Sequence, residues 1–194
     1  MKPLVPSESK MKLRERMLAW RRALRPEDHR RWSAAIAGRL QGLPEFQAAS
    51  VVLSYVSAKD NEADTQGIIS GLLSEGRAVW VPRVAPERRL DWYRIRGWAD
   101  LTPGRFGILE PAVGAAEPLP PPARAVCLTP GIAFTREGYR IGYGGGYFDR
   151  FLAGLGGTAI GLAFECQLVG TFPRDDYDRR VDIVVTESAV YRCG

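Results

Sequence analysis

Residues 128–150 carry the sequence Leu128-Thr-Pro-Gly-Ile-Ala-Phe-Thr-Arg-Glu-Gly-Tyr-Arg-Ile-Gly-Tyr-Gly-Gly-Gly-Tyr-Phe-Asp-Arg150. The apolar run 125–128 predicts a buried strand that ends here, and residues 147–155 have the spacing of an apolar helix face. Between the two lie Gly142, Gly144, Gly145 and Gly146. A strand, a glycine-rich loop and a helix start present bare backbone N–H groups to an anion, so the pattern indicates a phosphate site.

This loop matches none of the standard nucleotide signatures. The spacing Gly142-x-Gly144-x-x-Tyr147 lacks the third glycine of a dinucleotide fingerprint. A Walker A loop would end in Gly-Lys-Ser/Thr, which is absent here. Spacing alone therefore indicates phosphate binding and nothing finer, and a mobile surface turn is the alternative.

The rest of the chain alternates predicted helices and strands. Hydrophobic spacing predicts helices at 9–24, 27–41 and 65–75 and strands at 51–56, 78–84, 90–95, 125–129, 158–164 and 181–186. The first helix is expected to bury the stripe Leu13, Met17, Trp20 and Leu24. The proline-rich stretch 112–123 is expected to be a surface loop.

The strand–helix–strand order over 51–84 predicts a parallel strand pair. We expect a single α/β domain over residues 1–194, a three-layer, Rossmann-like arrangement with a mainly parallel sheet and helices on both faces. Ligands of such sheets gather beyond the carboxyl ends of the strands.

Composition excludes several classes of protein. The 194 residues are 45% hydrophobic and 25% charged, and no apolar run approaches the about 20 residues of a membrane span. The N-terminus has no apolar segment of signal-peptide length. Three widely spaced cysteines without a CxxC motif argue against disulfides and structural zinc, so we expect a cytoplasmic protein. Cys127 and Cys166 are expected in the core.

Charge and histidine content narrow the chemistry. The net charge of +5 favours anionic partners, either nucleic acid or a nucleotide with a polyanionic small substrate. The one histidine, His29, lies in a charged helical stretch and is expected to be a solvated surface group. Catalysis through a histidine base or ligand is therefore not expected, which leaves carboxylates, arginines, backbone amides and a bound ion.

The segments Pro130–Phe134 and Gly138–Leu152 closely resemble the signature of the 5-formyltetrahydrofolate cyclo-ligases. Shorter blocks resemble the same family in the same order: Lys10–Arg14, Glu62–Thr65, Val81–Arg83, Gly107–Pro111, Ala163–Gln167, Asp178–Asp182 and Val185–Glu187. The resemblance implies that ATP drives closure of 5-formyltetrahydrofolate to 5,10-methenyltetrahydrofolate through a phosphorylated formyl oxygen, with release of ADP and phosphate. We expect a monomer that acts on these two small molecules, without a membrane or nucleic-acid partner.

The resemblance also implies roles for single residues. Lys10 and Arg14 would contact the ATP phosphates; the alternative is a solvated helix face. The nucleotide loop would comprise Arg140, Ile141, Gly142, Tyr143, Gly144, Gly145, Gly146, Tyr147 and Phe148. Within it, Arg140 would act as a charge clamp and Tyr147 would stack on the pterin, which makes these two the candidate catalytic residues.

The implied folate site uses the same loop and a second one. Residues 143–147 (Tyr143, Gly144, Gly145, Gly146 and Tyr147) would also face the folate. Glu62 would accept hydrogen bonds from the pterin, and Val56 would supply an apolar contact. Asp64 and Thr65 are expected to cap the next helix instead.

Asp149 and Asp178 match the family's Mg²⁺ positions, and one or two carboxylates with phosphates suit that ion. The alternatives are a carboxylate that complements a helix dipole for Asp149 and a solvated acid for Asp178. Two positions depart from common family residues: Gly145 replaces the lysine of some members, and Phe148 replaces a frequent tyrosine.

Two rival functions remain open. Segment 139–150 interleaves aromatic residues with glycine and arginine, as the stacking strand of an RNA-binding module does, although three consecutive glycines would weaken such a strand. A catalytically silent relative on the same fold is the other rival. It is disfavoured because all the implied charged residues are present: Lys10, Arg14, Glu62, Asp149 and Asp178.

Overall fold

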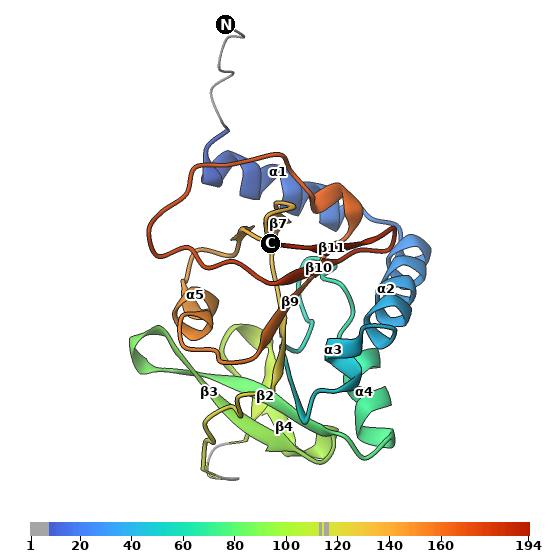
Figure 1. The fold of residues 1–194 in the computed structure, drawn as a ribbon, viewed down its shortest axis with the longest axis vertical. Helices are drawn as coiled ribbons and strands as arrows, with labels where there is room; N and C mark the ends of the chain where they lie inside the picture. The colour runs from blue at the N-terminus through green and yellow to red at the C-terminus, as the bar shows by residue number, and fades with distance from the viewer. Residues whose placement is uncertain (1–7, 113, 115–116) are drawn as a thin grey trace, which may run out of the picture.

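The computed structural model describes residues 8–112, 114 and 117–194. Within them, the main sheet has seven strands in the order β11-β10-β9-β6-β1-β2-β3 (Figure 1). The five inner strands run parallel, and the edge strands β3 and β11 are antiparallel to their neighbours. Their bounds are β1 Val51–Ser54, β2 Ala78–Ala85, β3 Arg89–Ile95, β6 Val126–Thr129, β9 Thr158–Leu162, β10 Ile183–Val185 and β11 Val190–Arg192.

Helices cover both faces of the sheet, as the sequence predicts. The helices are α1 Lys10–Arg22, α2 Pro26–Gln41, α3 Pro44–Gln47, α4 Gln66–Ser74 and α5 Tyr147–Leu152. α2, α3 and α4 share one apolar core with the sheet, while α5 lies on the opposite side (Figure 1). There the Phe151 ring of α5 lies 4.9 Å from that of Trp92 on β3. The three-layer α/β architecture is confirmed.

The strand order locates the ligand edge. Along the sheet the parallel strands follow one another as β2, β1, β6, β9 and β10, so the winding direction reverses between β1 and β6. This is a doubly wound sheet of the Rossmann-like class, and such sheets bind ligands at the reversal, outside the carboxyl ends of the strands. The loop 55–65 follows β1, and the segment 130–146 follows β6. Both loops that carry implied site residues therefore begin at the reversal.

Several short elements escape sequence analysis. Two small hairpins form, β4 Leu101–Pro103 with β5 Leu109–Pro111, and β7 Ala133–Phe134 with β8 Arg140–Ile141. The 3₁₀ turns are Pro86–Arg88, Trp98–Asp100, Arg105–Gly107 and Glu165–Gln167. Segments of two or three residues are too short for a periodic pattern, and α3 and β11 were missed for the same reason. The predicted helix 147–155 ends early, at Leu152.

Two further expectations can be compared with the structure. Cys127 is buried, but the expectation for Cys166 is wrong, because it lies exposed on the turn Glu165–Gln167 that follows β9. In the connector 112–123, residues 113, 115 and 116 lie outside the described residues. Beyond them, the Leu119 N–H donates to the Trp92 carbonyl at 3.0 Å, so this part of the connector runs along β3.

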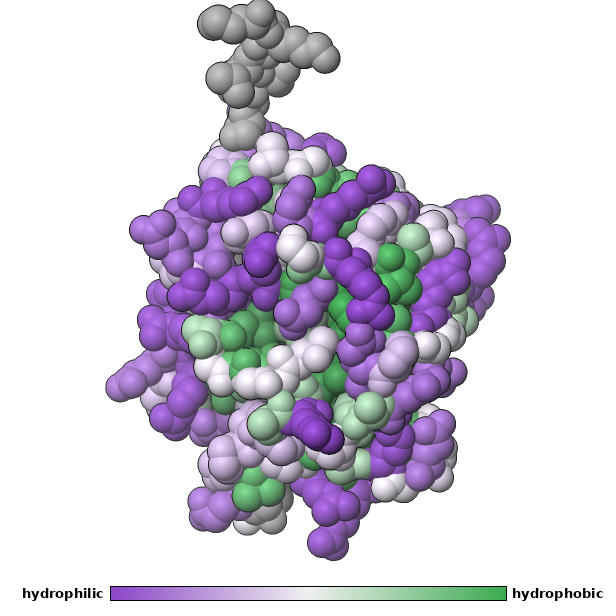
Figure 2. All heavy atoms as spheres, in the orientation of Figure 1, coloured by the Kyte–Doolittle hydropathy of each residue, from purple (hydrophilic) through white to green (hydrophobic). Residues whose placement is uncertain are grey.

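The surface is mostly polar. The face in Figure 2 is covered largely by hydrophilic side chains, with small apolar areas between them. In the part of the chain that the structure describes, no helix combines the length and the apolar character needed to cross a bilayer.

Candidate functional site

The glycine loop uses its glycines for different reasons. Gly144 and Gly146 have φ of +97° and +69°, in the left-handed region that other residues avoid, and Gly146 is the residue from which α5 starts. Gly145 has no positive φ, but a Cβ there would lie 2.6 Å from Cε2 of Tyr147. Gly145 therefore makes room for the Tyr147 ring, which packs partly buried beside the loop.

Helix α1 brings Arg14 to this loop and Lys10 to two aspartates of the segment 175–178. The Arg14 Nε donates to the Gly142 carbonyl at 2.8 Å, so Arg14 lies on the loop itself. The Lys10 Nζ lies 2.5 Å from the Asp175 carboxylate and 2.6 Å from that of Asp178. Partial burial opposes the charge of Lys10, but its hydrogen bonds to the two aspartates raise its pKa above the ordinary value. Neither cation is merely part of a solvated face, and their role toward ATP stays a prediction.

Arg140 lies beside Asp149, one of the two implied metal carboxylates. Its side chain is 3% exposed, and its Nη1 donates to the Arg179 carbonyl at 2.8 Å and lies 3.1 Å from Asp149 Oδ1. The Arg179 N–H donates to the same Asp149 oxygen at 3.2 Å. Burial lowers the pKa of Arg140, and Asp149 and, more weakly, Asp178 oppose this shift. The buried guanidinium therefore pairs directly with Asp149.

The donor set suits a magnesium ion that arrives with a nucleotide. In residues 8–112, 114 and 117–194 there is no group of three or more His, Cys, Asp or Glu side chains that could hold a metal alone. Mg²⁺ is usually held by one or two carboxylates together with phosphates and waters. Asp149 and Asp178 could supply the carboxylates. Asp149 also lies in the first turn of α5, so its charge complements the helix dipole as well.

The loop after β1 holds Glu62 in a half-buried place. Its Oε2 accepts a hydrogen bond from the Ala58 N–H at 3.3 Å. Burial raises the pKa of Glu62 above its ordinary value, and Arg21 is the first of the groups that oppose the shift. The expectation that His29 is a solvated group is wrong, because its Nε2 lies 2.7 Å from the Glu62 carbonyl oxygen and its ring meets Phe164 edge-on.

Three residues near Glu62 in the sequence make contacts that stabilise the fold. Asp64 caps α4, since its carboxylate accepts from the Gln66 N–H at 2.8 Å. Thr65 occupies the cap position, but its hydroxyl is buried and donates to the Tyr55 carbonyl at 2.7 Å. Val56 is 4% exposed and packs in the core between the sheet and α2, α3 and α4. The structure therefore places Val56 beneath the loop rather than on its surface.

Arg21 is the site residue that sequence reasoning missed. Its side chain is buried, and it donates to the Asp60 and Gly131 carbonyls and to the Tyr143 hydroxyl. These acceptors belong to the loop after β1, the turn after β6 and the glycine loop. A signal was present, because Arg21 follows Leu13 and Met17 at four-residue spacing on the buried face of α1.

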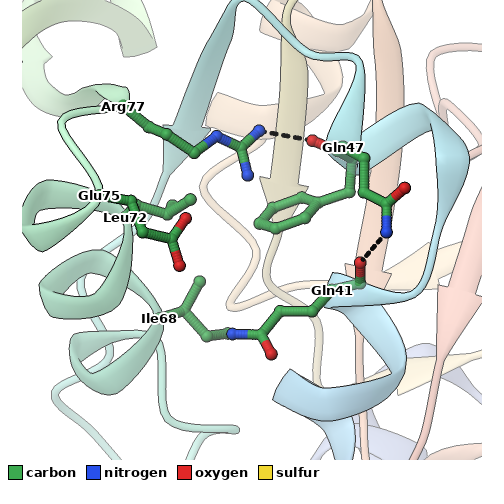
Figure 3. Close-up of a pocket in the computed structure, with 7 residues that line it drawn as sticks. Gln41, Gln47, Ile68, Leu72, Glu75 and Arg77 are labelled. Carbon is green, nitrogen blue, oxygen red and sulfur yellow. Dashed lines mark hydrogen bonds between the residues drawn. The ribbon is translucent and has the colours of Figure 1, made fainter.

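Two cavities lie away from the glycine loop. One of about 260 Å³ opens between the ends of α2 and α4, near the amino ends of β1 and β2 (Figure 3). Its lining includes Arg77, which donates to the Phe46 carbonyl at 2.5 Å. The other, of about 340 Å³, lies between α2 and the start of α4. Neither includes a residue of the glycine loop, so the chemistry of the residues defines the candidate site.

The segment 139–150 does not form a stacking platform. Strand β8 covers only Arg140–Ile141. The Tyr139 ring lies beneath the Arg174 guanidinium at 4.0 Å, and Phe148 packs against the apolar cores on both sides of the sheet. No described strand displays these aromatic rings together, so the RNA-binding alternative gains no support.

Comparisons with known proteins agree with this arrangement. The model of the 5-formyltetrahydrofolate cyclo-ligase family matches residues 6–187. The 5-formyltetrahydrofolate cyclo-ligase of Escherichia coli is 33% identical over 176 residues, covering 88% of this chain and 96% of that protein. The mouse protein of the same name is 25% identical over 195 residues, covering 94% and 96%.

A solved structure extends the likeness to the fold. The solution structure of Aquifex aeolicus 5,10-methenyltetrahydrofolate synthetase superimposes with a TM-score of 0.83 at 36% identity, covering 95% of this chain and 92% of that one. Fold, family model and relatives agree over nearly the whole length. The chain belongs to the 5-formyltetrahydrofolate cyclo-ligase family.

Proposed function

We propose that this protein uses ATP and Mg²⁺ to close 5-formyltetrahydrofolate to 5,10-methenyltetrahydrofolate, with release of ADP and phosphate. One observation carries the proposal: the glycine loop meets the Glu62 loop at the reversal of the sheet, where Tyr143 donates to Asp60 at 2.8 Å. One loop suits phosphates, and the other holds a partly desolvated carboxylate suited to the N–H groups of a pterin. Family membership supplies the substrate class.

The reaction needs positioning and charge neutralisation rather than an enzyme nucleophile. The formyl carbon is a poor electrophile because N5 donates electrons into it. When the formyl oxygen attacks the γ-phosphorus, an O–P bond forms, ADP leaves, and the carbon becomes an activated iminium phosphate. N10 then adds to this carbon, loses its proton, and phosphate departs with the former formyl oxygen. Such phosphoryl transfers depend on orientation and electrostatics.

The cations near the glycine loop would bind the ATP phosphates. Arg14 lies against Gly142, Lys10 pairs with the implied metal ligand Asp178, and the loop N–H groups would contact phosphate oxygens. Arg140, buried beside Asp149, would act as a fixed charge clamp. Mg²⁺, when bound with ATP by Asp149 and Asp178, would neutralise charge on the transferred phosphoryl group. Lys10 and Arg140 each already pair with one of these carboxylates, so binding Mg·ATP would exchange partners within one cluster.

The folate would lie on the Glu62 side. The Glu62 carboxylate would accept hydrogen bonds from the pterin, and the Tyr147 ring would stack on it. The small Gly145 lets this ring lie against the loop. The free thiols Cys127, Cys166 and Cys193 favour a reducing compartment, which supports a cytoplasmic enzyme.

The test is direct turnover by the purified protein. With 5-formyltetrahydrofolate, Mg²⁺ and ATP, the methenyl chromophore should appear, and omission of ATP should abolish it. A substrate labelled with ¹⁸O in the formyl group tests the phosphorylated oxygen, because the label should appear in the released phosphate. Turnover without ATP, or phosphate free of label, would overturn the corresponding part of the proposal.

A further inference from the structure

Arg21 connects three segments that the sheet does not connect. Its Nε donates to the Asp60 carbonyl at 2.7 Å, its Nη1 to the Gly131 carbonyl at 3.2 Å, and its Nη2 to the Tyr143 hydroxyl at 2.9 Å. Each guanidinium nitrogen therefore has an acceptor of its own. Arg21 is 1% exposed, so its guanidinium is shielded from water.

The bonds form a closed ring around the junction of the two loops. The Tyr143 hydroxyl, which accepts from Arg21, donates its proton to Asp60 Oδ2 at 2.8 Å. The amide of Asn61 donates to the Arg21 carbonyl at 2.8 Å, so backbone and side chain of Arg21 both hold the loop just before Glu62. Residues 60 and 61 also have positive φ of 51° and 50°, a strained turn that such contacts can maintain.

This arrangement is a costly way to gain stability alone. A buried guanidinium loses its hydration, and the acceptors of its hydrogen bonds are two carbonyls and a hydroxyl rather than a carboxylate. An apolar residue would fit the stripe that Leu13 and Met17 begin. The planar fork, by contrast, fixes three directions at once, which neither an apolar side chain nor a lysine can do.

We propose that Arg21 is a positioning residue that holds the Glu62 loop and the glycine loop at the spacing the cyclisation requires, acting through Tyr143 and Asp60. The inference rests on the proposed function, since it assigns folate and ATP to these two loops. In-line attack of the formyl oxygen needs both substrates aligned, and a displacement of about 1 Å can cost on the order of 10²-fold in rate. Each loop should still bind its own ligand when the bridge is broken.

The test compares Arg21→Lys with Tyr143→Phe, which removes one oxygen and keeps the ring. Arg16→Lys is the matched control on the same helix, because Arg16 is 56% exposed and pairs only with Glu8 in the described structure. Calorimetry gives the Kd of ATP and of the folate separately, and turnover gives kcat well below the melting temperature. We expect both Kd values to stay near wild type while kcat falls on the order of 10²-fold for Arg21→Lys and about tenfold for Tyr143→Phe.

The double variant shows whether the two residues act together. Because both remove the same bridge, its kcat should match that of Arg21→Lys rather than the product of the two losses. A lower melting temperature with normal kcat would make Arg21 purely structural and overturn the inference. A double variant whose kcat loss equals the product of the two single losses would also overturn it. If Arg21→Lys does not fold, normal kcat in Tyr143→Phe overturns it. Wild-type protein without ATP-dependent turnover would instead refute the proposed function.

Discussion

Gly145→Ala tests whether the glycine loop shapes the site through the Tyr147 ring. The added Cβ would lie 2.6 Å from Cε2 and 2.7 Å from Cδ2 of that ring, and an ordinary contact begins at 3.4 Å. The ring must therefore move by about 0.8 Å. Because it is the movable end of a half-buried side chain, the fold can absorb this at little cost. The pterin, however, would then meet a ring that has been displaced by the same distance.

The expected loss follows from this displacement. Misplacing a substrate by about 1 Å can lower the rate on the order of 10²-fold, so we expect kcat/KM for the folate to fall about 10- to 100-fold. Gly146→Ala is the matched comparison. It meets no atom within 4 Å but has a φ of +69°, so it should cost about 1–2 kcal/mol of stability through backbone strain.

The assay is steady-state formation of the methenyl product, with thermal melts of both variants. Gly145→Ala should keep its melting temperature, and Gly146→Ala should melt about 2–8 °C lower. The decisive measurement is Gly145→Ala in a Tyr147→Ala background, where the clash no longer exists. If Gly145→Ala lowers kcat/KM by the same factor in both backgrounds, the ring is not the cause and the reasoning fails.

Three further variants test the rest of the site. Glu62→Gln should raise KM for the folate about tenfold and leave KM for ATP unchanged. Burial raises the pKa of Glu62, so its ionised form costs stability at pH values above the folded pKa. Melts should therefore show that Glu62→Gln is more stable than wild type at neutral pH, and that this gain disappears as pH falls through the folded pKa to the unfolded value. Asp149→Asn should lower kcat on the order of 10²-fold and raise the Mg²⁺ requirement; normal Mg²⁺ dependence with a lower melting temperature would make it only a helix-dipole group. Arg14→Ala should raise KM for ATP about tenfold, and unchanged kinetics would leave Arg14 only its contact with Gly142.

The sheet could be predicted because its signals are local and repeated. Apolar runs rich in β-branched residues, such as Val51–Leu53 and Ile183–Val185, form buried strands. The intervening helices impose parallel pairing between the inner strands. Parallel winding then determines where both loops begin. Neither the hairpin β7–β8 nor the edge strand β11 has enough residues to produce such a signal.

Charge pairing could not be predicted, because it depends on how separate elements pack against one another. Lys10 meets Asp178 across 168 positions, and Arg140 meets Asp149 from the other side of the glycine loop. Composition shows many arginines without showing which are buried. The glycines posed the same difficulty, since only the backbone reveals that Gly144 and Gly146 need positive φ while Gly145 needs space.

Arg21 shows how a buried charge can be recognised in such a chain. The sequence predicts an apolar buried stripe on α1 that consists of Leu13, Met17, Trp20 and Leu24. In the structure the buried positions are Leu13, Met17 and Arg21, whereas Trp20 and Leu24 are half-buried. A cation on a core stripe needs acceptors, and strand carbonyls are already used in the ladder. The acceptors must therefore come from loops, whose carbonyls lack regular partners. In a doubly wound sheet the loops beyond the carboxyl ends also bind the ligands, so an arginine continuing an apolar stripe indicates contact with the active-site edge.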